Sequence, residues 1–180
     1  MSSSSVPRLK SDPPTGPLIV TALFGPGDDG WLQQLRRTHY PADRNQVPAH
    51  LTLFRQLPPS LEGELSRRLA AAAAAPPPRA TIAGVIDLGE GTALRVESAE
   101  LEAIREELAS AFHGLLMPQD QTALRPHITI QNKVVPKEAR ALQKQMRAGF
   151  EPRPLAIRAL ASWRYLGGPW QSLKTHSFRR

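Results

Sequence analysis

The chain of 180 residues carries a formal charge of +7 at pH 7 and contains no cysteine. This length suits one domain with its own core, and the absence of thiols excludes disulfides, thiol catalysis and cysteine-ligated metals. No apolar run approaches the ~18 residues of a membrane span, and the positive charge favours a phosphate-bearing partner. We therefore expect a monomeric, cytoplasmic protein outside the membrane.

The first 16 residues differ from the rest of the chain in composition. They read MSSSSVPRLKSDPPTG, a polar stretch without the apolar core of a secretory signal. Such a stretch has too few apolar side chains to offset the entropy lost on ordering. We predict a disordered leader over residues 1–16 and a single domain over residues 17–180.

Strands and helices alternate along the predicted domain. The segment GPGDDG ends a strand at 17–24 and offers Asp28 or Asp29 as the cap of a helix that contains Trp31, Leu32 and Leu35. A loop at 41–48 then leads into a strand at 50–54. The remaining predicted elements are a helix from about 58 through the alanine tract, a strand hairpin at 79–97, helices at 99–117 and 137–148, a strand at 127–131 and a hairpin at 155–178.

The predicted helix at 99–117 has two distinct faces. Its apolar face is formed by Leu101, Ile104, Leu108 and Phe112, which keep the 3.6-residue period. We expect the opposite, solvated face to consist of Glu100, Glu102, Arg105, Glu106 and Glu107.

The element order predicts an α+β fold with helices packed outside antiparallel sheets. Hairpins require antiparallel pairing, and helices that alternate with strands cover the sheet faces. The units strand-helix-strand-helix-hairpin and helix-strand-helix-hairpin form a loose internal duplication.

One histidine-containing strand lies in each unit of this duplication. The two strands read HLTLF at 50–54 and HITIQ at 127–131. Side chains at positions i and i+2 of a strand point to the same face, so each His shares a face with the Thr that follows. If the strands face each other, His50, Thr52, His127 and Thr129 line one cleft.

Two half-exposed strands with ordinary polar residues on the solvent face are the alternative interpretation. With five His in the chain, about 0.25 His-x-Thr matches are expected by chance, and two occur in the same apolar context. The pair therefore favours a site.

Two imidazoles and two hydroxyls in one cleft suit phosphate chemistry. Histidine titrates near neutrality, so one ring can accept a proton while the other donates one. Thr hydroxyls can stabilise charge on the phosphate oxygens. Two His are too few ligands for zinc, so we expect neither a metal nor another cofactor.

The sequences PAHLTLF and RPHITIQ resemble the 2H phosphoesterase superfamily, and within it the branch of 2'-5' RNA ligases, which are RNA 2',3'-cyclic phosphodiesterases. The resemblance implies a bilobal α+β fold with pseudo-two-fold symmetry, duplicated antiparallel sheets and a central cleft. It also implies metal-independent opening of a 2',3'-cyclic phosphate, on an RNA 3' end or a nucleotide, to a 2'-phosphomonoester. His50 and His127 match the catalytic residues of the family, and Thr52 and Thr129 match its phosphate-binding residues.

Further candidate substrate contacts surround the two motifs. Phe54 shares the strand face of His50, where it would stack on a base, with a place at the cleft edge or in the core as the alternative. Members of the family often carry a basic residue after the second motif, and here Lys133 follows Gln131 and Asn132. The full set of secondary candidates is Phe54, Arg55, Arg125, Gln131, Lys133 and His39, with ordinary surface charge as the alternative for the basic residues. We expect Trp163, Tyr165 and Trp170 to serve as core and hairpin pairs.

Two rival functions remain open at this stage. One is a binding module that holds RNA or a nucleotide without turnover. The other is 2'-5' ligation, the reverse of the same chemistry, as a side activity that water opposes. The sequence leaves open which His is the base.

Overall fold

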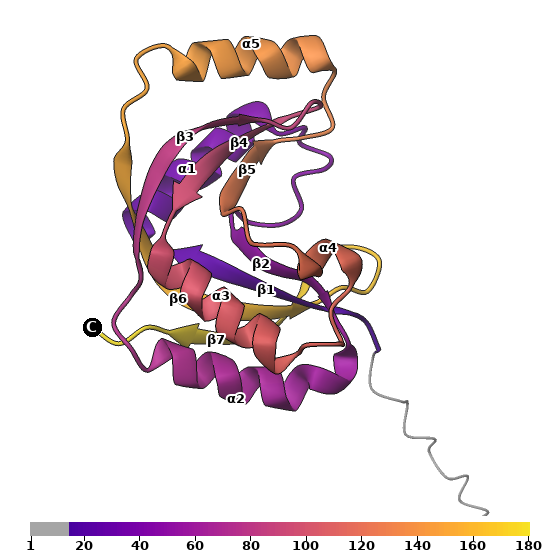
Figure 1. The fold of residues 1–180 in the computed structure, drawn as a ribbon. Coiled ribbons are helices and arrows are strands. Elements are labelled where there is room, and N and C mark those ends of the chain that lie inside the picture. The colour runs from indigo at the N-terminus through magenta and orange to yellow at the C-terminus, as the bar shows by residue number, and fades with distance from the viewer. Residues whose placement is uncertain (1–14) are drawn as a thin grey trace, which may run out of the picture.

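Residues 15–180 are described by the computed structural model, and in this part of the chain a seven-stranded antiparallel sheet forms the centre (Figure 1). Residues 1–14 of the predicted leader lie outside the described residues. The strands are β1 (Leu18–Phe24), β2 (Leu51–Leu57), β3 (Arg79–Asp87), β4 (Thr92–Glu97), β5 (His127–Gln131), β6 (Arg153–Arg164) and β7 (Gln171–Ser177). The helices are α1 (Pro26–His39), the 3-10 turn η1 (Pro59–Leu61), α2 (Glu62–Ala73), α3 (Ala99–Ala111), α4 (Pro118–Gln121) and α5 (Pro136–Arg147). The predicted α+β class is confirmed.

The long strand β6 joins two halves of the sheet. Its first residues, 153–156, pair with β3, and residues 157–164 pair with β1, while β7 pairs along its C-terminal half. The main strand order is β2-β1-β6-β3-β4-β5, so the two histidine-containing strands β2 and β5 lie at opposite edges. The sheet curves strongly, and these edge strands contact each other (Figure 1). Curvature thus brings the two motifs together.

The internal duplication differs from the predicted one in its third strand. One unit is β1-α1-β2-α2-β3, and the other is β4-α3-β5-α5-β6 with the short α4 added. The sequence predicted β3 and β4 as the hairpin of the first unit and β6 and β7 as the hairpin of the second. Instead β3 pairs with β4 in the half that contains β5, and β6 pairs with β1 in the half that contains β2. The short turn at 89–91 keeps β3 beside β4, because consecutive strands usually pair.

Helices cover the sheet from outside. Helix α5 packs on β3 and β4, and α2 packs on β6 and β7, at opposite ends of the molecule (Figure 1). Three phenylalanines that are at most 2% exposed, Phe24, Phe54 and Phe112, lie in the core. Burial of each such ring contributes about 1.5–3 kcal/mol. No helix in residues 15–180 combines the length and apolar character needed to cross a membrane.

Two helix boundaries differ from those predicted. Helix α1 begins at Pro26 with Gly25 as its cap, since proline is favoured in the first turn. The Asp28 carboxylate, expected as a cap, instead accepts a hydrogen bond from the Ala156 backbone N–H at 2.8 Å. Helix α3 ends at Ala111 rather than at 117, because Gly114 (φ +85°) turns the chain away.

Candidate active site

The first motif strand contains a β-bulge directly after its Thr. Thr52 lies opposite Thr21 of β1, but Phe54 lies opposite the adjacent Val20, so Leu53 is an extra residue. A bulge resets the alternation of side chains along a strand. Phe54 therefore turns into the core and is 0% exposed. The prediction that Phe54 shares a face with His50 and stacks on a base is wrong for this reason.

The second motif strand repeats the same irregularity. Thr129 lies opposite Ala93 of β4 and Gln131 opposite the adjacent Thr92, which leaves Ile130 as the extra residue. Gln131 is 2% exposed, and its Oε1 accepts a hydrogen bond of 2.9 Å from the Thr92 hydroxyl. Gln131 is thus a buried structural residue, and the prediction that it contacts substrate is wrong.

A cavity of about 580 Å³ lies between the two motif strands, and we call it the motif cleft. All four motif side chains line it. Thr52 lies on β2 and His50 directly precedes that strand, while His127 and Thr129 lie on β5. The alternating Leu and Ile residues of both motifs are buried on the other side. The other polar and aromatic residues that line the motif cleft are Arg36, Tyr40, Arg44, Arg55, Asn132 and Trp170.

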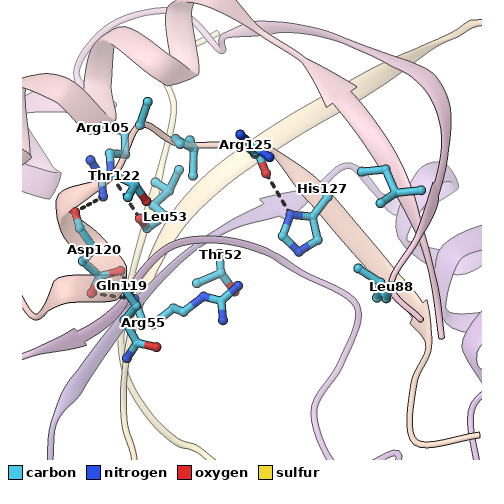
Figure 2. A pocket seen from close by; sticks show the side chains of 13 residues that line it. Thr52, Leu53, Arg55, Leu88, Arg105, Gln119, Asp120, Thr122, Arg125 and His127 are labelled. Carbon is cyan, nitrogen blue, oxygen red and sulfur yellow. Dashed lines mark hydrogen bonds between the residues drawn. The ribbon is translucent and has the colours of Figure 1, made fainter. Parts of the chain in front are cut away.

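Both imidazoles are held in the same orientation by a backbone carbonyl two residues earlier. His50 Nδ1 lies 2.7 Å from the Pro48 oxygen, and His127 Nδ1 lies 2.8 Å from the Arg125 oxygen. A carbonyl only accepts, so each Nδ1 carries the proton. Figure 2 shows this bond for His127, with the ring reaching into the space beside Thr52. In each ring Nε2 therefore remains for proton transfer.

The environment of His50 favours its neutral form. Burial, assisted by the nearby Arg36 and His127, lowers the pKa of His50 to about 4, although the bond to the Pro48 carbonyl opposes the shift. The Trp170 ring lies against the imidazole, with ring centroids 4.7 Å apart. Trp170 also contacts Trp163 at 6.1 Å, as expected for a hairpin pair, but it lines the cleft as well. At pH 7 His50 is thus suited to accept a proton.

A second cavity of about 440 Å³ adjoins the motif cleft, and we call it the side cleft (Figure 2). The two share four lining residues: Thr52, Arg55, Leu88 and His127. Arg125 and Gln119 add polar groups to the side cleft. The motif cleft is therefore open to a longer groove.

The secondary basic candidates separate into two groups. Arg55 lines both clefts and Arg125 lines the side cleft, and within residues 15–180 neither guanidinium has a hydrogen-bonding partner. Lys133 and His39 line neither cleft: Lys133 lies in the turn after β5 with φ +60°, and His39 is the last residue of α1. Arg55 and Arg125 are thus the candidates near the motifs.

Two buried arginines near the motifs were not anticipated. Arg36 and Arg105 are each 4% exposed. The prediction that Arg105 belongs to a solvated face is wrong, because it lies on the same face of α3 as Leu101 and Leu108. Its spacing of four and three residues from these leucines was the signal in the sequence. The spacing of Arg36 from the buried Leu32 is the corresponding signal in α1.

Within the described part of the chain, no three His, Cys, Asp or Glu side chains gather to hold a metal ion. The only motif-cleft residues of these types are His50 and His127. A catalytic zinc site in a protein normally uses three protein ligands. The donor set of the cleft therefore does not fit such a site.

Comparisons with known proteins show the family and the fold of the chain. The model of the 2'-5' RNA ligase superfamily matches residues 24–169. Among solved structures, TT0787 of Thermus thermophilus superposes with a TM-score of 0.59 at 17% identity, covering 91% of this chain and 98% of that one. LigT of E. coli complexed with NADP+ gives a TM-score of 0.59 at 16% identity, covering 93% and 100%.

LigT complexed with ATP gives a TM-score of 0.55 at 14% identity, with the same coverage of 93% and 100%. No curated protein sequence matches the chain. The structural likeness, at these identities, establishes the shared fold, and the family model covers most of the chain. The chain therefore belongs to the 2'-5' RNA ligase superfamily.

Proposed function

We propose that this protein hydrolyses a 2',3'-cyclic phosphate, on an RNA 3' end or a nucleotide, to a 2'-phosphomonoester without a metal ion. The observation that carries the proposal is the pair of imidazoles in the motif cleft, each oriented by a backbone carbonyl and each beside a Thr hydroxyl. Membership in a superfamily of phosphoesterases and ligases supports the reaction class. A binding module needs no such paired acid and base.

His50 is the general base in this proposal. Its low pKa leaves Nε2 unprotonated at pH 7, where it takes a proton from the attacking water. The water oxygen forms the new bond to phosphorus as the bond from phosphorus to the ribose 3' oxygen breaks. The leaving 3' oxygen takes its proton from Nε2 of His127. Two imidazoles on opposite sides of one phosphate suit this in-line displacement.

The phosphate oxygens are held by the hydroxyls of Thr52 and Thr129. Both side chains line the motif cleft and have no hydrogen-bonding partner within residues 15–180. Donors already directed at the phosphate stabilise the charge that develops on its oxygens in the transition state. Arg55, at the junction of the two clefts, adds positive charge.

A nucleotide fits the size of the motif cleft. Its volume of about 580 Å³ falls in the range of small-molecule sites. The similar LigT of E. coli has been solved with ATP and with 3'-AMP, at TM-scores of 0.55 and 0.53. All four proposed catalytic and phosphate-binding residues come from one chain, so we propose that a monomer acts. A chain without cysteine suits the reducing cytoplasm, which we propose as its location.

Incubation with 2',3'-cyclic mononucleotides and short RNAs ending in a cyclic phosphate is expected to yield 2'-phosphomonoesters, read by phosphorus NMR. We expect the same rate in excess EDTA, because both proton transfers use side chains. Loss of hydrolysis in EDTA, with recovery on adding a divalent ion, would contradict metal independence. Tight binding without product would favour the binding module. Joining of a cyclic phosphate end to a free 5'-hydroxyl RNA at a rate above that of hydrolysis would favour ligation.

The assignment of His50 as base predicts the acidic limb of the pH profile. A base must be unprotonated, and its pKa in the folded protein is lowered to about 4. We therefore expect kcat/KM to hold as the pH falls from 7 to 5 and to decline about tenfold per unit below about 4. Measurement of kcat/KM from pH 3.5 to 8, with circular dichroism to confirm folding, checks this. A decline that begins near pH 6.5 would contradict the assignment.

A further inference from the structure

Two buried arginines each connect one motif strand to the segment that precedes the other motif. Arg36 lies on α1 and Arg105 on α3, and each is 4% exposed. Neither belongs to a His-x-Thr motif, yet each donates to a backbone carbonyl at a motif bulge. A buried guanidinium is costly unless its donors are satisfied, and these contacts offset the cost of burying both side chains.

Arg36 links the loop before the first motif to the strand of the second. Its Nη1 donates to the Thr129 carbonyl at 2.7 Å. Its Nη2 donates to the Val47 carbonyl at 3.0 Å, and its Nε to Asn45 Oδ1 at 3.1 Å. Val47 directly precedes Pro48, whose carbonyl orients His50. The side chain of Arg36 thus contacts both the loop that orients His50 and the strand that carries His127.

Arg105 makes the reciprocal link. Its Nε donates to the carbonyl of Leu53, the bulge residue of the first motif strand, at 3.3 Å. Its Nη2 donates to the carbonyl of Asp120 in α4, the short helix before the second motif. Figure 2 shows Arg105 beside Asp120 and Leu53. The Asp120 carboxylate in turn accepts from the backbone N–H of Arg55 at 3.0 Å, on the first motif strand.

The two arginines occupy equivalent places in the duplication. Helix α1 lies between the first two strands of one unit and α3 between the first two of the other, yet each arginine reaches the motif strand of the opposite unit. Each guanidinium also lies over an aromatic ring, Tyr40 at 4.4 Å and Phe54 at 4.5 Å. β2 and β5 are edge strands, so their outer carbonyls at the bulges have no neighbouring strand to pair with.

We infer that Arg36 and Arg105 are reciprocal positioning residues, which together set the separation and alignment of the two catalytic imidazoles across the motif cleft. This inference rests on the proposed function. The fork of the guanidinium suits the task, since it directs several N–H groups to fixed points, whereas a lysine presents a single flexible ammonium. A displacement of about 1 Å in a catalytic group can cost about 10²-fold in rate.

The test compares Arg36→Lys, Arg105→Lys and the double variant in the full chain, with a 2',3'-cyclic nucleotide as substrate. Each single variant is expected to lower kcat about 10²-fold with KM changed less than about threefold, because phosphate binding by the Thr hydroxyls is retained. The double variant is expected to lose about 10²–10³-fold in total, since both residues act on the same separation. Losses that multiply to about 10⁴ would overturn the inference.

Matched variants separate positioning from general stability. Arg153 also lies over an aromatic ring, Trp31 at 4.0 Å, and donates a hydrogen bond to Asp28, but it lines neither cleft. We therefore expect Arg153→Lys to leave kcat unchanged. Asn45→Ala removes one hydrogen-bond acceptor of Arg36 and leaves the arginine itself in place, so it tests the inference even if Arg36→Lys fails to fold. We expect this variant to lower kcat three- to tenfold. Full kcat in folded Asn45→Ala and Arg105→Lys would overturn the inference.

Absence of any hydrolysis in the wild-type chain would reject the proposed function instead. The inference is then tested by crystal structures of the wild type and Arg105→Lys, through the distance between Nε2 of His50 and Nε2 of His127. A changed distance supports reciprocal positioning, and an unchanged distance overturns it.

Discussion

Replacing His50 or His127 with alanine is expected to lower kcat for cyclic phosphate hydrolysis by about 10²–10⁴-fold, the range for loss of a general acid or base. Each ring has its Nδ1 bound to a carbonyl, so Nε2 is the only nitrogen available for proton transfer. No other histidine lines either of the two clefts in the described chain. Initial rates with saturating 2',3'-cyclic AMP measure the effect.

His113→Ala is the matched control for both variants. His113 is exposed near the end of α3 and lines neither cleft, so its replacement is expected to leave kcat unchanged. Circular dichroism and thermal unfolding establish that the variants fold. Wild-type kcat in either folded cleft variant would remove that histidine from the mechanism and would contradict the acid–base pair.

Replacing Thr52 or Thr129 with valine is expected to lower kcat by about 10²–10³-fold, as for the loss of one donor to a developing anion. Valine keeps the branched shape and replaces the hydroxyl with a methyl group, which cannot donate a hydrogen bond. Both hydroxyls lie in the motif cleft without a partner in residues 15–180, so the loss falls on the phosphate rather than on an internal bond. Steady-state kinetics with separate kcat and KM values measure the effect.

Thr175→Val, at an exposed position of β7, serves as the control for these valine variants. We expect its kinetics to match those of the wild type. If Thr52→Val or Thr129→Val raised KM and left kcat unchanged, the hydroxyls would bind the ground state and the transition state equally. That result would contradict their proposed role in the reaction and leave them only a role in binding.

Local patterns predicted the elements well, because they depend on neighbours in the chain. The alternation of His and Thr with Leu and Ile predicted two strands with one buried face, and Leu51 and Ile128 are indeed fully buried. The same alternation failed two residues after each Thr, where Phe54 and Gln131 are buried. The bulges at Leu53 and Ile130 depend on register with β1 and β4, which are distant in sequence, and so Phe54 was misplaced.

Charge patterns proved less reliable than apolar patterns. Arg105 was expected in solvent because charged residues flank it, yet carbonyls of two other segments satisfy it in the interior. A charged side chain can be buried only where such partners converge. Their positions follow from the path of distant strands and loops, which no local period encodes.

Side-chain periodicity and motif spacing are properties of the local chain, so the α+β class and the two His-x-Thr strands could be predicted from the residues alone. No local pattern predicted that β3 and β6 exchange between the halves of the sheet, that the edge strands β2 and β5 contact each other, or that Arg36 and Arg105 connect them. Strand pairing and the burial of charge depend on partners far away in the sequence, and these are defined only when the whole chain packs.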